Sequence, residues 1–136
     1  MNSILDISTS GLMAQRARLN AISSNLANMS TTRNEAGELQ PYQPRFVVFQ
    51  TDEELRTPEG GMGVEVSSVE VEDGPPRLKY QPNHPDADKE GMVAYPNVNM
   101  TQEFVDALEA TRAYEANVGV IEVTKNLNQQ TLRILI

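Results

Sequence analysis

Apolar residues recur every seven positions in the N-terminal part of the chain. The members of this series are Leu5, Leu12, Leu19 and Leu26. Ile22 and Met29 lie three positions after Leu19 and Leu26. The spacing predicts a helix over residues 3–29 with one narrow apolar stripe, clearest from Gly11 onward. Polar residues interrupt the stripe near its start, so we expect this helix to need a partner.

A second helical pattern occupies the C-terminal part. Asn99 or Thr101 is suited to cap a helix whose first turn carries Glu103 and Asp106. One apolar strip of this helix consists of Phe104, Ala107, Tyr114, Val118, Ile121, Leu132 and Leu135. A neighbouring strip consists of Val120, Val123, Leu127 and Ile134. Two strips on one slender helix suggest two neighbours, which we expect to be the N-terminal helix and another molecule.

The middle of the chain, residues 30–99, has the composition of short strands and turns. It holds all eight prolines and all but two of the eight glycines. Residues 45–50, 64–71 and 77–80 are rich in β-branched and aromatic residues or alternate with polar ones, which predicts three strands. Turn-forming residues at 60–61 and 73–76 separate them. We therefore expect a small antiparallel hairpin or meander with one face packed on a helix.

These patterns together predict a mostly α-helical fold with a small β-rich middle. The expected parts are an N-terminal helix within residues 1–29, a β-rich segment at 30–99 and a C-terminal helix at 100–136. The two helices should pair as a coiled-coil-like bundle. The three parts should form one structural unit.

Composition excludes several classes of function. The net charge is −8, with no run of basic residues, which disfavours binding to nucleic acids or to anionic membrane surfaces. The absence of cysteine excludes disulfides, thiolate nucleophiles and zinc–thiolate sites. No stretch approaches the roughly 20 apolar residues of a membrane span, and the N-terminus lacks the basic start and apolar centre of a cleavable signal peptide.

The one histidine lies in a loop that superficially resembles a site for hard cations. His84, Asp86, Asp88 and Glu90 stand at alternate positions, but their order does not match an EF-hand and Lys89 lies among them. We interpret the segment as a solvated turn-rich loop, and a metal-dependent enzyme remains the alternative from another class. No serine stands in a nucleophile-elbow pattern. We expect no catalytic, cofactor-binding or metal-binding residues.

Two asparagines near the end of the first helix invite an explanation, because asparagine is a poor residue for a helix interior. Asn25 and Asn28 lie on either side of Leu26. One interpretation is a fraying helix end with Asn28 as its cap. The other is a pair of carboxamides that bond to a neighbouring backbone in an assembly. The residues alone do not decide between the two.

The ends of the chain resemble a known family. The stretches SGLMAQRARLN at residues 10–20 and SNLAN at 24–28 are similar to the N-terminal signature of flagellar rod and hook proteins. The stretch TRAYEANV at 111–118 is similar to their C-terminal signature. These motifs indicate the flagellar axial family without selecting a member.

The middle of the chain resembles the proximal rod members of this family. The similarity lies in the order and spacing of PY at 41–42 with VVF at 47–49, GVEV at 63–66, HPDAD at 84–88 and YPNVN at 95–99. The short length fits too, because distal rod and hook members carry a larger middle domain. Met92 departs from the pattern, since an aromatic residue is expected there. Another axial protein or a secreted coiled-coil adaptor is the rival interpretation, which these middle motifs disfavour.

The resemblance implies a structural subunit and not an enzyme. It implies export by the flagellar type III apparatus without a cleaved signal, and helical assembly in the periplasmic rod of the basal body to transmit torque. The implied partners are copies of the chain and other proximal and distal rod proteins. The residues expected at helix–helix or subunit contacts are Leu5, Leu12, Leu19, Ile22, Asn25, Leu26, Asn28, Phe104, Tyr114, Asn117, Val118, Ile121 and Leu132.

Overall fold

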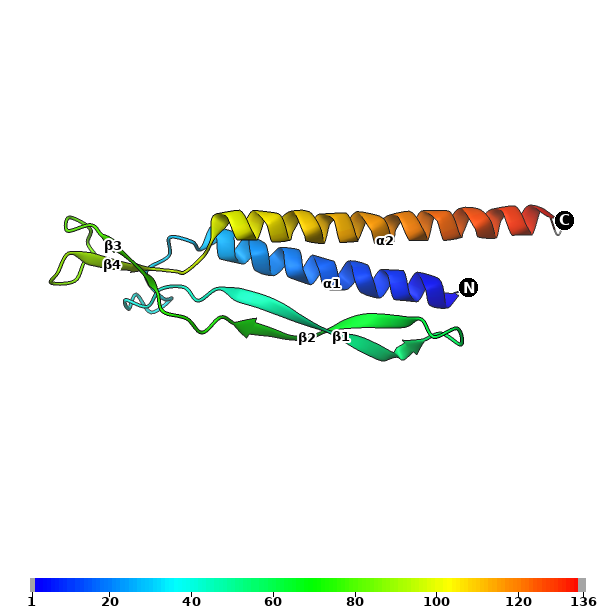
Figure 1. The fold of residues 1–136 in the computed structure, drawn as a ribbon, viewed down its shortest axis with the longest axis horizontal. Helices are drawn as coiled ribbons and strands as arrows, with labels where there is room; N and C mark the ends of the chain where they lie inside the picture. The colour runs from blue at the N-terminus through cyan, green and yellow to red at the C-terminus, as the bar shows by residue number, and fades with distance from the viewer. Residues whose placement is uncertain (1, 135–136) are drawn as a thin grey trace.

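The computed structural model describes residues 2–134 and shows an elongated molecule built in three layers (Figure 1). Helix α1 (Asn2–Ala27) lies between the longer helix α2 (Met100–Ile134) and a β-hairpin. The two helices run antiparallel, so both ends of the chain lie at one end of the molecule. A second small sheet lies at the opposite end. This arrangement confirms the predicted fold class.

Each helix has a defined end near the β-rich part. Asn99 caps α2, because its Oδ1 accepts the backbone N–H groups of Thr101 at 3.1 Å and Gln102 at 3.3 Å. At the end of α1, the side-chain nitrogen of Asn28 donates to the carbonyl oxygen of Ser24 at 3.0 Å. Both caps come from residues that the sequence singled out. The helix predicted over residues 3–29 spans Asn2–Ala27, so it ends two residues earlier than expected.

The hairpin consists of β1 (Arg45–Arg56) and β2 (Met62–Val71). The strands pair antiparallel from Arg45 opposite Val71 to Arg56 opposite Met62, with irregularities after Val48 and after Asp52. One face of the hairpin packs along α1, as expected. Strand β1 runs six residues beyond the predicted end at Gln50, where its polar sequence gives no apolar alternation.

The second sheet pairs β3 (Arg77–Tyr80) with β4 (Met92–Tyr95). We call residues 77–98 the β3–β4 lobe. Its small core contains Val93, Pro96 and Val98, all of which are buried. Strand β4 was not predicted from the sequence, because four residues without polar alternation give too little signal. Gly91, with a φ of 78°, makes the turn before β4 possible.

Candidate assembly surfaces

Asn25 joins three elements at one end of the helix pair. Its side-chain nitrogen donates to the carbonyl oxygen of Arg45 at 2.8 Å and to Oε1 of Glu103 at 3.1 Å. Its Oδ1 accepts the backbone N–H of Arg45 at 2.8 Å and the hydroxyl of Tyr42 at 3.1 Å. Asn25 is only 3% exposed, and all four of its hydrogen-bonding positions are filled within the chain. The carboxamide thus ties α1 to the start of β1 and to the first turn of α2.

The bonds to Arg45 give Asn25 the pairing pattern of a neighbouring strand. Its carboxamide forms hydrogen bonds with both the N–H and the carbonyl of Arg45, on the edge of the hairpin that faces the helices. Tyr42 strengthens the junction, because its hydroxyl also lies 3.0 Å from the hydroxyl of Ser24. Neither sequence-based interpretation described Asn25 correctly, since its partner is a backbone within the same chain. Asn28 has the capping role that the simpler interpretation gave it.

A second point of attachment holds the other half of the hairpin against α1. The hydroxyl of Ser10 donates to the carbonyl of Ile7 at 2.7 Å and accepts the backbone N–H of Val64 at 3.0 Å. Gly63 beside it is buried, and a Cβ there would lie only 3.2 Å from the hydroxyl oxygen of Ser10 in α1. The hairpin therefore lies close to the helix at both attachment points.

Small and polar side chains form the contact between α1 and α2. Asn25 lies beside Glu103, Arg18 bonds to Asp106 and Glu109, and Gly11 lies against Asn117. The ion pairs of Arg18 are partly exposed at 3.3–3.4 Å, so they contribute little to stability. These contacts place the row Gly11, Arg18 and Asn25 on the face of α1 toward α2. Leu12, Leu19 and Leu26 of the predicted row each follow a position of the Gly11 row by one residue, so the leucines lie on a neighbouring face of the helix and are only partly buried.

Gly11 allows the two helices to approach closely. A Cβ at this position would lie 2.9–3.0 Å from the carboxamide of Asn117, so that side chain would have to shift. We expect Gly11→Ala to destabilise the helix pair by about 1 kcal/mol, because overpacking exceeds the gain in helix propensity. In an Asn117→Ala background the same change should stabilise by up to about 1 kcal/mol. Thermal unfolding followed by circular dichroism would show this reversal of sign, and equal effects in both backgrounds would contradict it.

Burial raises the pKa of Glu103, and the nearby carboxylates of Asp106 and Glu72 raise it further, while the hydrogen bond from Asn25 opposes the shift. The folded protein therefore holds this proton more tightly than the unfolded chain does. Stability contributed by protonated Glu103 is present below the ordinary pKa of 4.5 and is lost as the pH rises through the folded value.

We expect Glu103→Gln to remove this loss of stability with rising pH, because glutamine does not ionise. The glutamine oxygen can still accept the hydrogen bond from Asn25. The free energy of unfolding of the variant, measured from pH 4 to 7, should fall less with rising pH than that of the parent. Asp86→Asn serves as the control, since hydrogen bonds from Thr32 and Arg33 lower the pKa of Asp86. Its stabilisation is present above the ordinary value of 3.8 and is lost as the pH falls below it. An unchanged slope in Glu103→Gln would exclude Glu103 as the cause.

The face of α2 away from α1 exposes large apolar side chains. We call Val120, Val123, Leu127 and Ile134 the outer strip, and their exposed fractions are 45%, 58%, 57% and 83%. Phe104, Tyr114 and Leu132 are exposed as well. A structure of this size that leaves so many large apolar side chains in water is typical of a subunit that completes its packing with other molecules.

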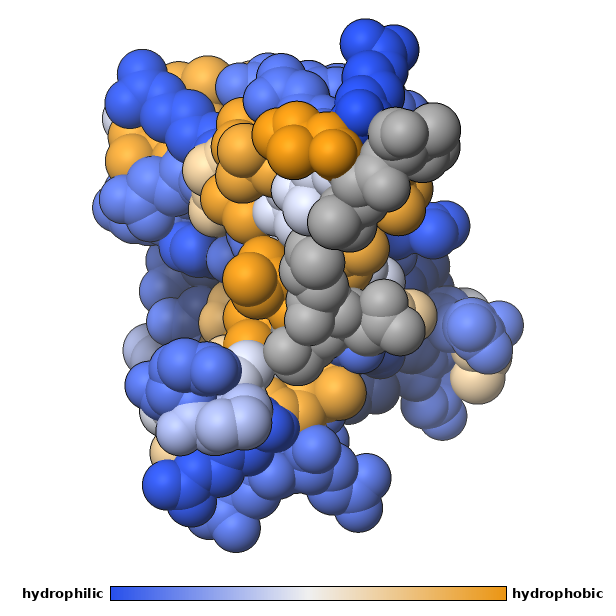
Figure 2. Space-filling model, turned by 90° about the vertical axis from the view of Figure 1, so that its right-hand side faces the viewer, coloured by the Kyte–Doolittle hydropathy of each residue, from blue (hydrophilic) through white to orange (hydrophobic). Residues whose placement is uncertain are grey.

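The end of the molecule that carries the chain termini is also apolar. Figure 2 shows hydrophobic side chains gathered in the middle of this end, with polar ones around them. Asn25 beside Glu103 and Gly11 beside Asn117 fix the alignment of the helices, which places Asn2 level with about residue 126. Residues 127–134 of α2, which we call the α2 tip, therefore extend past α1, as Figure 1 shows.

Comparison with known proteins identifies the family. Residues 5–33 match the family model "Flagella basal body rod protein", and residues 89–134 match "Flagellar basal body rod FlgEFG protein C-terminal". The flagellar basal-body rod protein FlgC of Borreliella burgdorferi is 39% identical, over 98% of this chain and 96% of that protein. The FlgC proteins of Bacillus subtilis and Salmonella typhimurium are each 40% identical, over 96% of this chain and 95% of theirs.

The chain belongs to the FlgC family of flagellar basal-body rod proteins. It is a structural subunit of the rod and is located in the flagellar basal body. The family is structural and not enzymatic, and it implies assembly with other proteins of the rod and basal body. None of the helices described within residues 2–134 is both long and apolar enough to cross a membrane.

The structure places the predicted contact residues of this FlgC family member in three environments. Ile22 and Asn25 are buried inside the chain. Phe104, Tyr114 and Leu132 are exposed. The remaining predicted residues are partly buried, namely Leu5, Leu12, Leu19, Leu26, Asn28, Asn117, Val118 and Ile121. Leu135, from the first predicted strip, lies outside the described residues. Which of these residues contact another subunit stays a prediction.

The His84 loop uses its polar groups to hold its own shape. Asp86 has a side chain that is 7% exposed, accepts from Thr32 at 2.6 Å and forms an ion pair with Arg33. Asp88 accepts the backbone N–H groups of Glu90 at 2.8 Å and Met92 at 2.9 Å. Residues 2–134 contain no cluster of three or more ligating side chains placed to hold a metal ion. The carboxylate of Asp86 thus fastens the β3–β4 lobe to the segment after α1, while that of Asp88 shapes the turn before β4.

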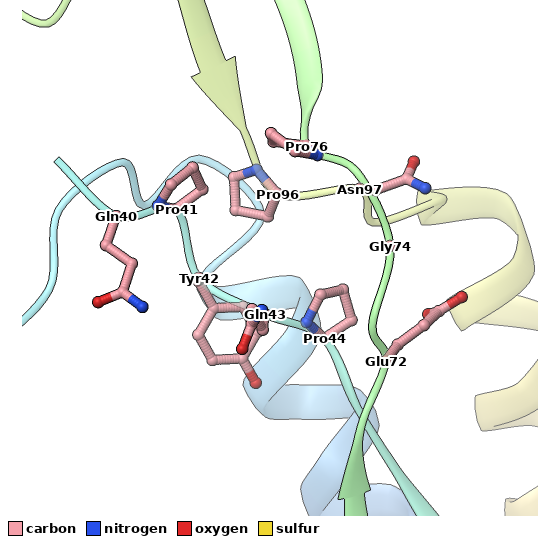
Figure 3. Close-up of a pocket in the computed structure, with 10 residues that line it drawn as sticks. All are labelled: Gln40, Pro41, Tyr42, Gln43, Pro44, Glu72, Gly74, Pro76, Pro96 and Asn97. Atoms are coloured by element: carbon pink, nitrogen blue, oxygen red, sulfur yellow. The ribbon is translucent and has the colours of Figure 1, made fainter.

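Prolines line the region that connects the lobe to the helical body. We call residues 40–44 and 72–76, together with the adjoining residues 96–97 of the lobe, the neck. It encloses a pocket of about 110 Å³, and Figure 3 shows Pro41, Pro44, Pro76 and Pro96 around it. Because proline fixes φ, these extended segments have little freedom. The neck therefore has restricted backbone freedom at its prolines.

Proposed function

We propose that this subunit assembles helically with copies of itself and with adjacent rod proteins through the outward faces of its two end helices. The exposed outer strip of α2 carries this proposal, since no other part of the chain that the structure describes packs over it. The partly buried leucine row of α1 offers a second surface of the same kind. In the assembled rod, contacts through both helices and a stiff neck would transmit torque from one subunit to the next.

We further propose that folding is completed during assembly. The contact between α1 and α2 buries mainly small and polar groups, and an isolated helix of this length is marginal in water. The Asn25 junction holds one end of the helix pair, whereas the opposite end has no comparable network in the described residues. The free ends of both helices should therefore fray in the monomer. A frayed chain is suited to pass through the flagellar type III export apparatus before neighbouring subunits order it.

Limited trypsin digestion of the dilute monomer tests this proposal. Arg112 and Lys125 lie along α2, while Arg45 and Lys79 lie in the β-rich middle. We expect cleavage first at Lys125, then at Arg112, and more slowly at Arg45 and Lys79. Rods purified from cells should protect the α2 sites. A monomer that resists at every site until it unfolds as one unit would contradict assembly-coupled folding.

A further inference from the structure

The two strands of the hairpin exchange places along its length. At the neck end, Asn25 of α1 bonds to both backbone groups of Arg45, so β1 is the strand that faces the helices there. At the other end, Ser10 of α1 accepts the backbone N–H of Val64, so β2 faces them instead. Figure 1 shows the strands crossing between these two points. Near the neck, β2 is therefore the strand on the side away from the helices.

The backbone of β2 has a free edge near the neck. In an antiparallel pair, a residue that turns both backbone groups outward lies opposite one that does the same. Arg45 turns both groups toward α1 and lies opposite Val71, so the N–H and carbonyl of Val71 point to the outer edge. Val69 repeats this orientation two residues earlier. The N–H of Glu72 donates to the carbonyl of Pro44 at 2.7 Å, as the alternation requires. We call residues 66–72 the β2 edge, and within the described residues no third strand pairs with it.

One face of the β2 edge is apolar and open. Val66, Val69 and Val71 are 37%, 54% and 45% exposed, although folded proteins usually bury valine. Val47, which lies opposite Val69 in β1, is partly buried, so the apolar face is covered along β1 and open along β2. Prolines and lysines commonly protect free edges, and Met62–Val71 contains neither. An edge with these properties is suited to pair with a further strand.

The opposite face of the β2 edge is acidic. Glu70 alternates with the valines, and Glu72 follows directly after the strand. Both glutamates are exposed, and within the described residues no cation forms an ion pair with either of them. A strand added beside β2 would place its side chains next to the valines on one face and the glutamates on the other. The complementary strand therefore alternates apolar residues with lysine or arginine. A second copy of β2 lacks this chemistry, because residues 62–71 contain glutamates but no basic residue.

We propose that the β2 edge pairs with an extended segment of a different rod protein, in which basic and apolar residues alternate. The segment adds a third strand to the hairpin, with backbone hydrogen bonds to Val69 and Val71 and basic side chains beside Glu70 and Glu72. This rests on the proposed assembly with adjacent rod proteins and adds a contact outside the helices. Among the strands of the described residues only β3 has the same alternation, and its four residues are too few to cover the edge.

A photoreactive side chain at the edge tests this pairing in the assembled rod. Val69 is replaced by p-benzoylphenylalanine, isolated basal bodies are irradiated, and the cross-linked peptides are identified by mass spectrometry. We expect position 69 to be joined to another rod protein, within a segment that alternates basic and apolar residues. The matched control carries the same group at Glu53, on the exposed far part of β1, and should not reach that segment. A product of twice the subunit mass, a partner segment without the alternation, or rods that give no product would each overturn the proposal.

Proline at the same position tests the backbone hydrogen bond. Val69→Pro removes an N–H that points away from β1, so the circular dichroism of the monomer should not change. We expect this variant to be absent from isolated basal bodies, whereas Val69→Ala, which keeps the N–H, should be incorporated. Normal incorporation of Val69→Pro would overturn the pairing and leave the assembly through the helices standing.

Charge reversal covers the case in which the proline variant fails to fold. Glu70→Lys leaves the backbone intact and repels a basic segment, so it should also be absent from basal bodies, and normal incorporation would again overturn the pairing. Val123→Asp in the outer strip tests the helical assembly separately. Failure of one proposal is thus distinguished from failure of the other.

Discussion

Replacing Asn25 with alanine is expected to detach the hairpin and the start of α2 from the end of α1. The change leaves the N–H and carbonyl of Arg45 without their partner and removes one of the two hydrogen bonds of the Tyr42 hydroxyl, which keeps its contact with Ser24. Buried groups left unpaired cost about 1–3 kcal/mol each. Since water can enter from a neighbouring pocket lined by Phe46 and Glu103, we expect a total loss of about 3 kcal/mol.

Two measurements follow this loss. Chemical denaturation of the monomer gives the change in stability, and hydrogen exchange at the Arg45 amide shows whether the junction has opened. Asn20→Ala is the matched control, because Asn20 is an exposed asparagine on the same helix. If both variants lose the same small amount of stability, the junction does not have the importance that its geometry indicates.

A compensating pair tests the directions of the hydrogen bonds. Asn25→Asp keeps the oxygen atoms but loses the donor to Arg45 and faces the carboxylate of Glu103. We expect it to destabilise as strongly as Asn25→Ala at neutral pH. Adding Glu103→Gln should recover part of the loss, because the glutamine amide can donate to the new carboxylate. No recovery in the double variant would show that the bond to Glu103 contributes little.

The sequence predicted the elements well where the spacing of apolar residues was long enough to be distinctive. The two helices and the strands at 64–71 and 77–80 appear close to their expected bounds. Strand β4 was missed, because its pairing with β3 comes from the turn at residues 81–91 and not from its own pattern. Local turn geometry of this kind is fixed by bonds such as those of Asp88, which a pattern of hydrophobicity does not contain.

The face on which the helices meet could not be predicted from the leucine row. Apolar periodicity identifies the stripe that is to be buried, but it does not show which neighbour buries it. Within this chain α2 packs against Gly11 and its row, where the absence of a side chain allows close approach. The leucines beside this row remain partly exposed. In a subunit whose neighbours are other molecules, the strongest apolar stripe need not be the one that the fold buries.

The role of Asn25 was open for a related reason. Its position near a helix end left two interpretations equally open, a frayed end capped by Asn28 and carboxamides that bond to another molecule. Only the placement of β1, which begins 20 residues later, shows that the carboxamide pairs with a backbone of its own chain. Long-range polar contacts of this type depend on the complete fold, so one polar residue in a helical pattern cannot reveal its partner.

A charge in the outer strip is expected to abolish rod incorporation without affecting the monomer. Val123 and Leu127 are more than half exposed, so Val123→Asp or Leu127→Asp should change the monomer's stability by less than about 0.5 kcal/mol. In an assembled rod the same carboxylate would lie in an apolar contact, where a buried group without a partner costs several kcal/mol. Each variant should leave cells non-motile in soft agar, with the protein absent from purified basal bodies.

Gln129→Asp is the matched control, because it adds the same charge to an exposed polar position of the same helix. It should swim normally, which would separate the effect of the strip from that of added charge alone. Secreted or cytoplasmic protein of normal stability must be detected for each variant, so that loss of assembly is distinguished from degradation. Normal swimming of both strip variants would mean that this face of α2 lies toward solvent in the rod. The subunit contacts would then have to be sought on the leucine row of α1, where Leu19→Asp is the corresponding test.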